Sequence, residues 1–203
     1  ARGAGKDSEI IAYDDAGGGK SGRLVFTLHA MGFTHCSILD GGWNAWLAAG
    51  LATDNGKPEA NTAEQVVSPE YIGDNLADRD WILQHLNDDG VALLDTRSLG
   101  EFTGDIIRAA RGGHIPGAAH YEWTDAMDVA HQHALRPTNE LLSELEQRGI
   151  TRDKEIVVYC QTHHRSAHTY ALLKHLGFDK VRGYPGAWSD WGNQPDTPVE
   201  TGA

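Results

Sequence analysis

The sequence predicts an α/β fold in which helices flank a parallel sheet, arranged as a tandem repeat whose first copy is truncated. Strand-like and helix-like segments alternate through residues 71–203, an order that is typical of parallel sheets covered by helices. One pattern also occurs twice: an apolar strand, a polar or glycine-rich loop, a helix, Gly-Phe, and a final Trp-x-x-Trp. In both copies nine positions separate the glycine after the helix from the glycine before the tryptophans, Gly32 to Gly41 and Gly177 to Gly186.

The first copy, residues 1–55, contains only the second half of a domain. Parallel strands are predicted at residues 10–13 and 36–39. Only 13 residues precede Asp14, which occupies the position that Cys160 has in the second copy. Because half a domain would leave parallel strands unpaired, we expect a missing N-terminal segment of the same protein to complete it. The alternative is a divergent extension that packs on the second copy.

The second copy, residues 71–203, follows a linker at residues 56–70 that is polar and has no apolar period. One of its predicted helices begins at Thr138 directly after Pro137, which is a typical helix start. The predicted elements of this copy are strands at 91–95, 118–120 and 156–159, a turn at 113–118, and helices at 138–148 and 166–176.

Composition and charge exclude several classes of function. The net charge of −12 argues against nucleic acid as a partner. No apolar run is long enough to span a membrane. Two cysteines do not form a disulfide framework, and Cys36, in a short apolar run, is expected to pack as a small hydrophobe. No signal peptide is visible, so we expect a cytoplasmic protein.

Cys160 lies where an apolar strand ends and a helix begins. At the start of a helix the backbone N–H groups lack partners and the helix dipole is positive, so a thiolate is stabilised there as the nucleophilic anion. Arg165 adds a positive charge that does not titrate. Four residues separate Cys160 from Arg165, whereas the loop of cysteine-dependent phosphatases has five. The smaller ring of N–H groups favours one extra sulfur atom over a phosphate.

Further segments around this loop carry a resemblance to a known family. With residues 160–166, and in the same order along the chain, they resemble the rhodanese sulfurtransferases, in particular tandem members with an inert N-terminal and a catalytic C-terminal domain. The resemblance implies that residues 1–55 are the C-terminal half of an inactive rhodanese-like domain and that residues 71–203 form the catalytic domain. The segments are residues 94–97 (Leu-Asp-Thr-Arg), 101–102 (Glu-Phe), 113–118 (Gly-His-Ile-Pro-Gly-Ala) and 184–191 (Tyr-Pro-Gly-Ala-Trp-Ser-Asp-Trp).

The resemblance implies a sulfurtransferase that moves a sulfane sulfur through a persulfide on Cys160. Its partners would be a small anionic sulfur donor, such as thiosulfate, and an acceptor that is cyanide, a thiol or a protein. Asp95 and Arg97 are expected to brace the loop from beside it. No organic cofactor is expected, and no metal, because ligands within one tight loop cannot all face one ion. The loop N–H groups are expected to form a nest for the outer sulfur, and the substrate-binding residues would be Gln161, Thr162, His163, His164, Arg165 and Ser166.

Two departures from the family pattern affect the expected site. Many rhodaneses have glycine where this chain has His163, and both loop histidines are candidates for the pocket rim. Thiosulfate-using tandem members often have an arginine near Glu101, so the acid is expected to repel a dianionic donor. Arg108 and Arg111 are the candidates to compensate.

Two other functions remain open at this point. One is a sulfur-relay or binding module whose loop only carries the persulfide to a partner. The other is a phosphatase or arsenate reductase with a contracted cysteine loop. Turnover with free thiosulfate and cyanide separates the sulfurtransferase from the relay module.

Overall fold

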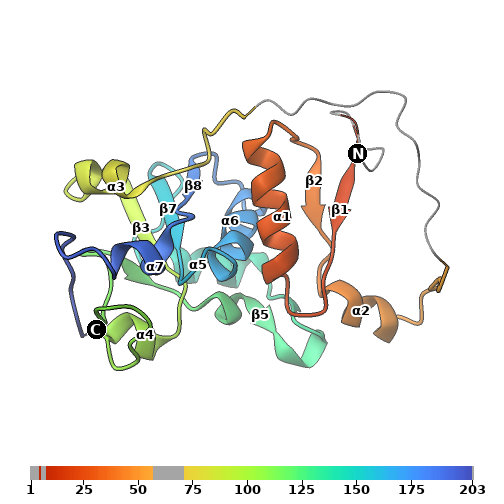
Figure 1. Ribbon diagram of the computed structural model, residues 1–203. Helices are drawn as coiled ribbons and strands as arrows, with labels where there is room; N and C mark the ends of the chain where they lie inside the picture. The colour runs from red at the N-terminus through yellow and green to blue at the C-terminus, as the bar shows by residue number, and fades with distance from the viewer. Residues whose placement is uncertain (1–4, 6–7, 57–70, 203) are drawn as a thin grey trace.

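The computed structural model describes residues 5, 8–56 and 71–202. Figure 1 shows the first repeat, in red and orange, beside the larger second domain, in yellow to blue. The predicted linker at 56–70 lies almost wholly outside the described residues. None of the helices in the described part combines the length and apolar character that a membrane crossing requires.

The second domain is built on a four-stranded sheet whose strands all pair in parallel, in the order β4-β3-β7-β8. This confirms the predicted parallel sheet. Three of the strands, β3, β4 and β7, follow the predicted runs to within one residue, whereas β8 was not predicted. The strands are β3 (Val91–Asp95), β4 (Ala119–His120), β7 (Glu155–Tyr159) and β8 (Val181–Gly183).

Helices cover both faces of this sheet because β7 is apolar on both faces. Successive side chains of a strand point to opposite faces. Ile156 and Val158 therefore belong to one buried cluster, with α5 and α6, and Val157 and Tyr159 to the other, with α3 and α7. The helices are α3 (Arg79–His85), α4 (Leu99–Thr103), α5 (Thr138–Gln147), α6 (Arg165–His175) and α7 (Ala187–Trp191).

The segment between β4 and α5 leaves the main sheet and forms a short antiparallel hairpin. Its two short strands pair Met127 with Leu135 and Asp128 with Ala134. The sequence pattern did not predict these elements, because each is only two to four residues long. They are η1 (Trp123–Ala126), β5 (Met127–Asp128), η2 (Val129–His131) and β6 (Ala134–Leu135).

The first repeat has the same strand register as its counterpart in the second domain. β1 (Ile10–Ala12) and β2 (Cys36–Ile38) pair in parallel, with Ile10 opposite Cys36. The equivalent pair in the second domain is Ile156 opposite Val181. Two helices complete the first repeat, α1 (Gly19–Ala30) after β1 and α2 (Gly42–Ala48) after β2. The two copies therefore share the pairing of their strands as well as the spacing of their sequences.

The two repeats differ in what lies beside the first strand. β7 pairs with both β3 and β8, whereas β1 pairs only with β2 among the described residues. Ile11 on β1 and Tyr13, directly after this strand, are 56% and 58% exposed. The expectation that a further segment of the protein completes this half domain stays a prediction.

Helix α1 joins the first repeat to the second domain by packing along α6, as Figure 1 shows. The two backbones approach closely at Gly22, where a Cβ atom would lie 2.7 Å from the His168 backbone nitrogen. Phe26, one turn further along α1, is part of the main core cluster of the second domain. A side chain at Gly22 would therefore push the repeats apart.

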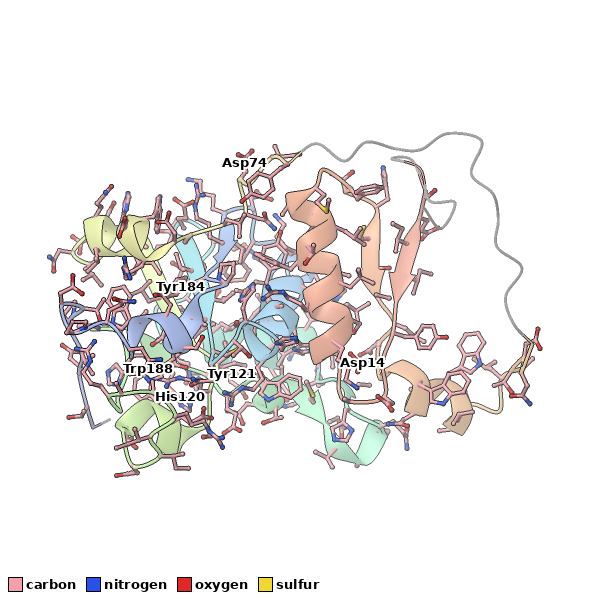
Figure 2. All side chains as sticks on the ribbon, viewed as in Figure 1. Asp14, Asp74, His120, Tyr121, Tyr184 and Trp188 are labelled. Carbon is pink, nitrogen blue, oxygen red and sulfur yellow. The ribbon has the colours of Figure 1, made fainter. Side chains whose placement is uncertain are left out.

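Asp14 fixes the start of α1 with its side chain (Figure 2). Its carboxylate accepts four backbone N–H groups at 2.8–3.0 Å and the hydroxyl of Ser21 at 3.0 Å. Partial burial raises the pKa of this carboxyl, but the hydrogen bonds outweigh it and lower the pKa to about 2. The first loop is thus an N–H cradle that holds an anion. The N–H donors belong to Ala16, Gly18, Lys20 and Ser21.

We predict that Asp14→Asn lowers the free energy of unfolding by about 1–3 kcal/mol, because an amide group cannot accept from all five donors. Urea denaturation measures the change. The control is Asp15→Asn, since Asp15 makes only an exposed ion pair with Lys20 at 3.4 Å. That control is expected to cost less than about 0.5 kcal/mol. Equal effects of the two variants would contradict this role of Asp14.

Candidate active site

Cys160 lies directly after β7 and one short loop before α6, as the sequence predicts. Only 1% of the surface of Cys160 is exposed to solvent. The backbone around it is held by α7: the Cys160 carbonyl accepts the N–H of Trp188 at 2.9 Å, and the Gln161 carbonyl accepts that of Ser189 at 3.1 Å. The C-terminal Trp-containing segment therefore fixes the position of the cysteine backbone.

The loop after Cys160 has the backbone form of an anion-binding nest. His163 is left-handed, with φ of 60°, and His164 is right-handed, with φ of −94°. This alternation turns successive N–H groups toward one concave side. A left-handed non-glycine residue costs about 1–2 kcal/mol, so the surrounding contacts must hold His163 in place.

The His163 side chain points into the core, and its predicted place at the pocket rim is therefore wrong. The ring packs edge-on against Phe26 with centroids 4.3 Å apart, and Nδ1 lies 2.7 Å from the Ser166 hydroxyl. Burial, together with the nearby charge of Arg23, lowers the pKa of His163 to about 3. Only the backbone of this residue can contact a ligand in the loop.

The other loop side chains have different surroundings. Gln161 donates from Nε2 to the Arg108 carbonyl at 3.1 Å and so links the loop to the neighbouring segment. Thr162 and His164 are exposed on the outer side of the loop, with Thr162 Oγ1 3.4 Å from His164 Nδ1. Of the two histidines, only His164 matches the expectation of a rim residue.

The first repeat indicates which N–H groups of the catalytic loop face an anion. The repeat aligns Gly22 of α1 with Ala167 of α6. One position before them Ser21 aligns with Ser166, and four positions before them Gly18 aligns with His163. Gly18 and His163 both have positive φ, 91° and 60°. In the first loop the N–H groups at these positions donate to the Asp14 carboxylate. The loop after Cys160 therefore repeats the backbone geometry of a cradle that already holds an anion.

Arg165 is held between Glu101 and Cys160. Its guanidinium makes a two-point contact with the Glu101 carboxylate, at 2.7 and 3.0 Å. Burial alone would lower the pKa of Arg165, but Glu101 and the adjacent Cys160 sulfur raise it. The side chain is therefore a fixed positive charge beside the nucleophile.

Glu101 does not present a free charge to the donor. Its side chain is 3% exposed and faces Arg165, with Arg108 Nε at 3.3 Å on its other side. Burial raises the pKa of Glu101, but Arg165 and the Ser98 hydrogen bonds bring it down to about 2. One carboxylate and two guanidinium groups leave this cluster with a net positive charge.

The two arginines expected to offset the charge of Glu101 have different surroundings. Arg108 lies in the Glu101 cluster with a side chain that is 60% exposed, so it remains available to an anion. Arg111 is turned away and donates to the carbonyl groups of Thr197 and Trp191, at 2.6 and 3.1 Å. The expectation that Arg111 compensates at the site is therefore wrong, because its hydrogen bonds tie down the C-terminal segment.

Asp95 and Arg97 form a buried ion pair at the end of β3. Arg97 Nε lies 2.9 Å from Asp95 Oδ1, and both side chains are at most 1% exposed. The Arg97 guanidinium also stacks 4.5 Å from the centre of the Trp188 ring. Since Trp188 holds the Cys160 carbonyl, the pair reaches the nucleophile through one intermediate residue, which fits the predicted bracing role.

The sequence pattern missed three contributors to the site. Trp188 and Ser189 hold the loop through backbone N–H groups, and Arg23 of α1 reaches the loop carbonyls. The one signal that could have found Arg23 is the repeat itself, which pairs α1 with α6. A metal site built on Cys160, His163 and His164 does not fit the geometry, because the His163 ring is turned into the core.

Comparison with known proteins decides the family. A family model described as a rhodanese-like domain matches residues 1–49 and 78–194. The chain belongs to this rhodanese-like family. A thiosulfate sulfurtransferase of Azotobacter vinelandii is 44% identical over 194 residues, which cover 96% of this chain and 70% of that protein. The sulfur carrier protein TtuD of Thermus thermophilus is 30% identical over 98% of this chain and 73% of that protein.

A solved structure of an enzyme has the same fold over the length of this chain. It is the anaerobic ergothioneine biosynthesis enzyme from Chlorobium limicola in complex with trimethyl histidine. It is 25% identical, with a TM-score of 0.88 over the whole of this chain. This chain spans about half of that enzyme, 53% of its length.

We predict that Glu101→Gln lowers kcat/KM for thiosulfate about tenfold, because Arg165 loses a two-point charged partner and its fixed position. A thiosulfate:cyanide assay measures the change. The control is Glu144→Gln on α5, whose carboxylate pairs with Arg136 at 2.7 Å. A gain in activity for Glu101→Gln would instead support repulsion of the donor.

Two buried histidines also predict a pH dependence of stability. Burial lowers the pKa of His163 to about 3 and that of His168 to about 4. Between about pH 4 and 6.5 the unfolded chain therefore binds more protons than the folded one, and stability falls as pH falls through this window. Each histidine contributes at most about 1.4 kcal/mol per pH unit.

Urea denaturation at pH 7, 6 and 5 tests this pH dependence. The variant His163→Asn should flatten it, because asparagine tolerates the left-handed backbone and does not titrate. His131→Asn is the control, since that side chain is 77% exposed. An unfolding free energy that is the same at pH 5 and pH 7 would refute the prediction.

Proposed function

We propose that this protein is a sulfurtransferase that moves a sulfane sulfur from a small anionic donor, such as thiosulfate, to an acceptor through a persulfide on Cys160. One observation carries the proposal. Cys160 occupies the position of Asp14 in the repeat, and the Asp14 carboxylate is held by four backbone N–H groups and one hydroxyl. The relatives with thiosulfate sulfurtransferase and sulfur carrier names support the same chemistry.

The chemical step is a double displacement. The Cys160 thiolate attacks the outer sulfur of thiosulfate, a new S–S bond forms, and the donor S–S bond breaks to release sulfite with its electron pair. The acceptor then attacks the outer sulfur of the persulfide, and the electron pair of that S–S bond returns to Cys160. Cyanide, a thiol or a protein thiol can fill the acceptor role, and no oxidant or cofactor is consumed.

The N–H cradle stabilises the anionic outer sulfur. That sulfur is two bonds from Cβ, as each carboxylate oxygen is in Asp14, so it can reach the equivalent donors. By the repeat these are the N–H groups of His163, Arg165 and Ser166. The remaining substrate-binding candidates, Gln161, Thr162 and His164, form the outer side of the loop.

Local charge explains how an acidic protein binds an anionic donor. The chain carries a net charge of −12, but Glu101, Arg165 and Arg108 together leave one positive charge beside Cys160. Attraction at this short range outweighs the diffuse negative field, which salt screens. We assign donor binding to Arg165 and Arg108, and support of the loop to Asp95 and Arg97.

The proposal includes the organisation and location of the protein. Residues 71–203 are the catalytic domain, residues 56–70 are a linker, and residues 1–55 are half of an inactive rhodanese-like domain that a further segment completes. Both cysteines are unpaired. A reducing compartment keeps such thiols free, so we place the protein in the cytoplasm.

A sulfur-relay module is the second candidate function. The 1% exposure of Cys160 favours a sulfur that is protected until a partner docks, as a carrier requires. A phosphatase is the weaker alternative, because the loop is one residue shorter than a phosphatase loop and leaves less room for phosphate. Turnover of free thiosulfate and cyanide supports the enzyme, persulfide loading without turnover supports the relay module, and hydrolysis of p-nitrophenyl phosphate supports the phosphatase.

We predict that thiosulfate adds the mass of one sulfur atom to the protein and that cyanide removes it, as intact mass spectrometry can measure. Cys160→Ser should abolish both the mass gain and sulfur transfer. The matched control is Cys36→Ser, because the Cys36 thiol only contacts the Phe33 carbonyl at 3.6 Å. Equal losses in the two variants would overturn the assignment of the nucleophile.

A further inference from the structure

Helix α1 of the first repeat contacts the catalytic loop from the side opposite the nest. Arg23 Nη1 lies 3.2 Å from the His163 carbonyl oxygen and 3.4 Å from that of Thr162. These are the carbonyls on either side of the left-handed residue His163. Within the described residues, no carboxylate pairs with Arg23, so its charge is directed to the loop.

The backbone geometry explains why one cation can reach both carbonyls. In helix-like conformations of either hand, successive carbonyl groups point in nearly the same direction, whereas in an extended chain they alternate. In each planar trans peptide the N–H points opposite to its carbonyl. When Arg23 holds the two carbonyls on its side, the N–H groups of His163 and His164 face away from it, and the His163 N–H is one of the three assigned to the cradle.

The same helix also fixes the His163 side chain. Phe26, one turn after Arg23, packs edge-on against the ring at 4.3 Å. Gly183 of β8 lies against the ring, where a Cβ atom would overlap it. The backbone and the side chain of His163 are thus both held, and Arg23 and Phe26 of the first repeat contribute to both.

We propose that Arg23 is a positioning residue for the catalytic loop, so that the first repeat, although it has no nucleophile, sets the direction of the N–H groups that stabilise sulfur on Cys160. This inference rests on the proposed sulfur transfer. It assigns to α1 a task in catalysis in addition to its packing on α6.

The test uses the full chain in a Cys36→Ser background, so that only Cys160 reacts with iodoacetamide. In Arg23→Ala the inward N–H groups lose their support and the thiolate loses stabilisation. The midpoint of the plot of Cys160 alkylation rate against pH should move upward by about half a pH unit. Thiosulfate kcat should fall about tenfold, less than the 10²–10³ typical of removing a direct donor. KM should change less than kcat.

Two variants serve as controls. Lys20→Ala removes a cation from the same helix that pairs only with exposed Asp15 at 3.4 Å, and it should match the parent protein. Arg23→Lys keeps a cation within reach of a carbonyl and should recover part of kcat. A thermal melt accompanies each variant, and the proposal expects Arg23→Ala to retain the Tm of the Lys20→Ala control to within about 3 °C.

The outcomes separate this inference from the proposed function. If Arg23→Ala shows the alkylation midpoint and kcat of Lys20→Ala, the inference is overturned. A loss of kcat that comes with a lower Tm and an unchanged midpoint also overturns it, because the role is then only structural. If the parent protein transfers no sulfur, the proposed function fails, while the alkylation midpoint still tests whether Arg23 orients the loop.

Discussion

A backbone cradle that needs an anion lies at the strand–helix junction of both repeats, and the rest of the structure depends on it. Unpaired N–H groups at the start of a helix are costly to bury without an acceptor. In the first repeat Asp14 fills the cradle permanently with its own carboxylate. In the second repeat Cys160 occupies that position, and a thiolate or persulfide can fill the cradle and leave it again. Under the proposed function, one fold feature thus serves as a helix cap in one copy and as a reaction site in the other.

Under the proposed function, the charges around Cys160 hold the exchangeable anion only weakly. A free Arg165 beside the sulfur would hold an anion strongly, but Glu101 takes up both sides of its guanidinium. Arg108 then supplies the positive charge that remains, from an exposed position. The donor is attracted without being trapped, which a double displacement needs because each intermediate must also leave.

The strained loop is supported from three directions. The backbone of Cys160 is held by α7, the end of β3 is braced by the Asp95–Arg97 pair, and His163 is held by α1. A left-handed histidine in place of the family's frequent glycine makes this support necessary. Helix α1 of the first repeat provides part of this support, and it packs on α6 through the close approach at Gly22.

The sequence by itself determined the local arrangement of this protein. Apolar runs with helix starts behind them predicted β3, β7, α5 and α6, and the spacing of Cys160 and Arg165 placed a nucleophile and a cation in one loop. These features depend on neighbours along the chain, which pattern and periodicity report directly. The repeat also predicted that β1 and β2 pair in parallel, because equal spacing implies equal connections.

Only the tertiary structure decided how distant residues meet. Glu101 and Arg165 are 64 positions apart and Arg23 and His163 are 140 apart, so no local pattern shows that they touch. Whether His163 faces solvent or core depends on the gap left by Gly183 and on Phe26 from another repeat. The direction of a charged or aromatic side chain is set by the space that packed elements leave, and that space exists only once the helices and sheet have come together.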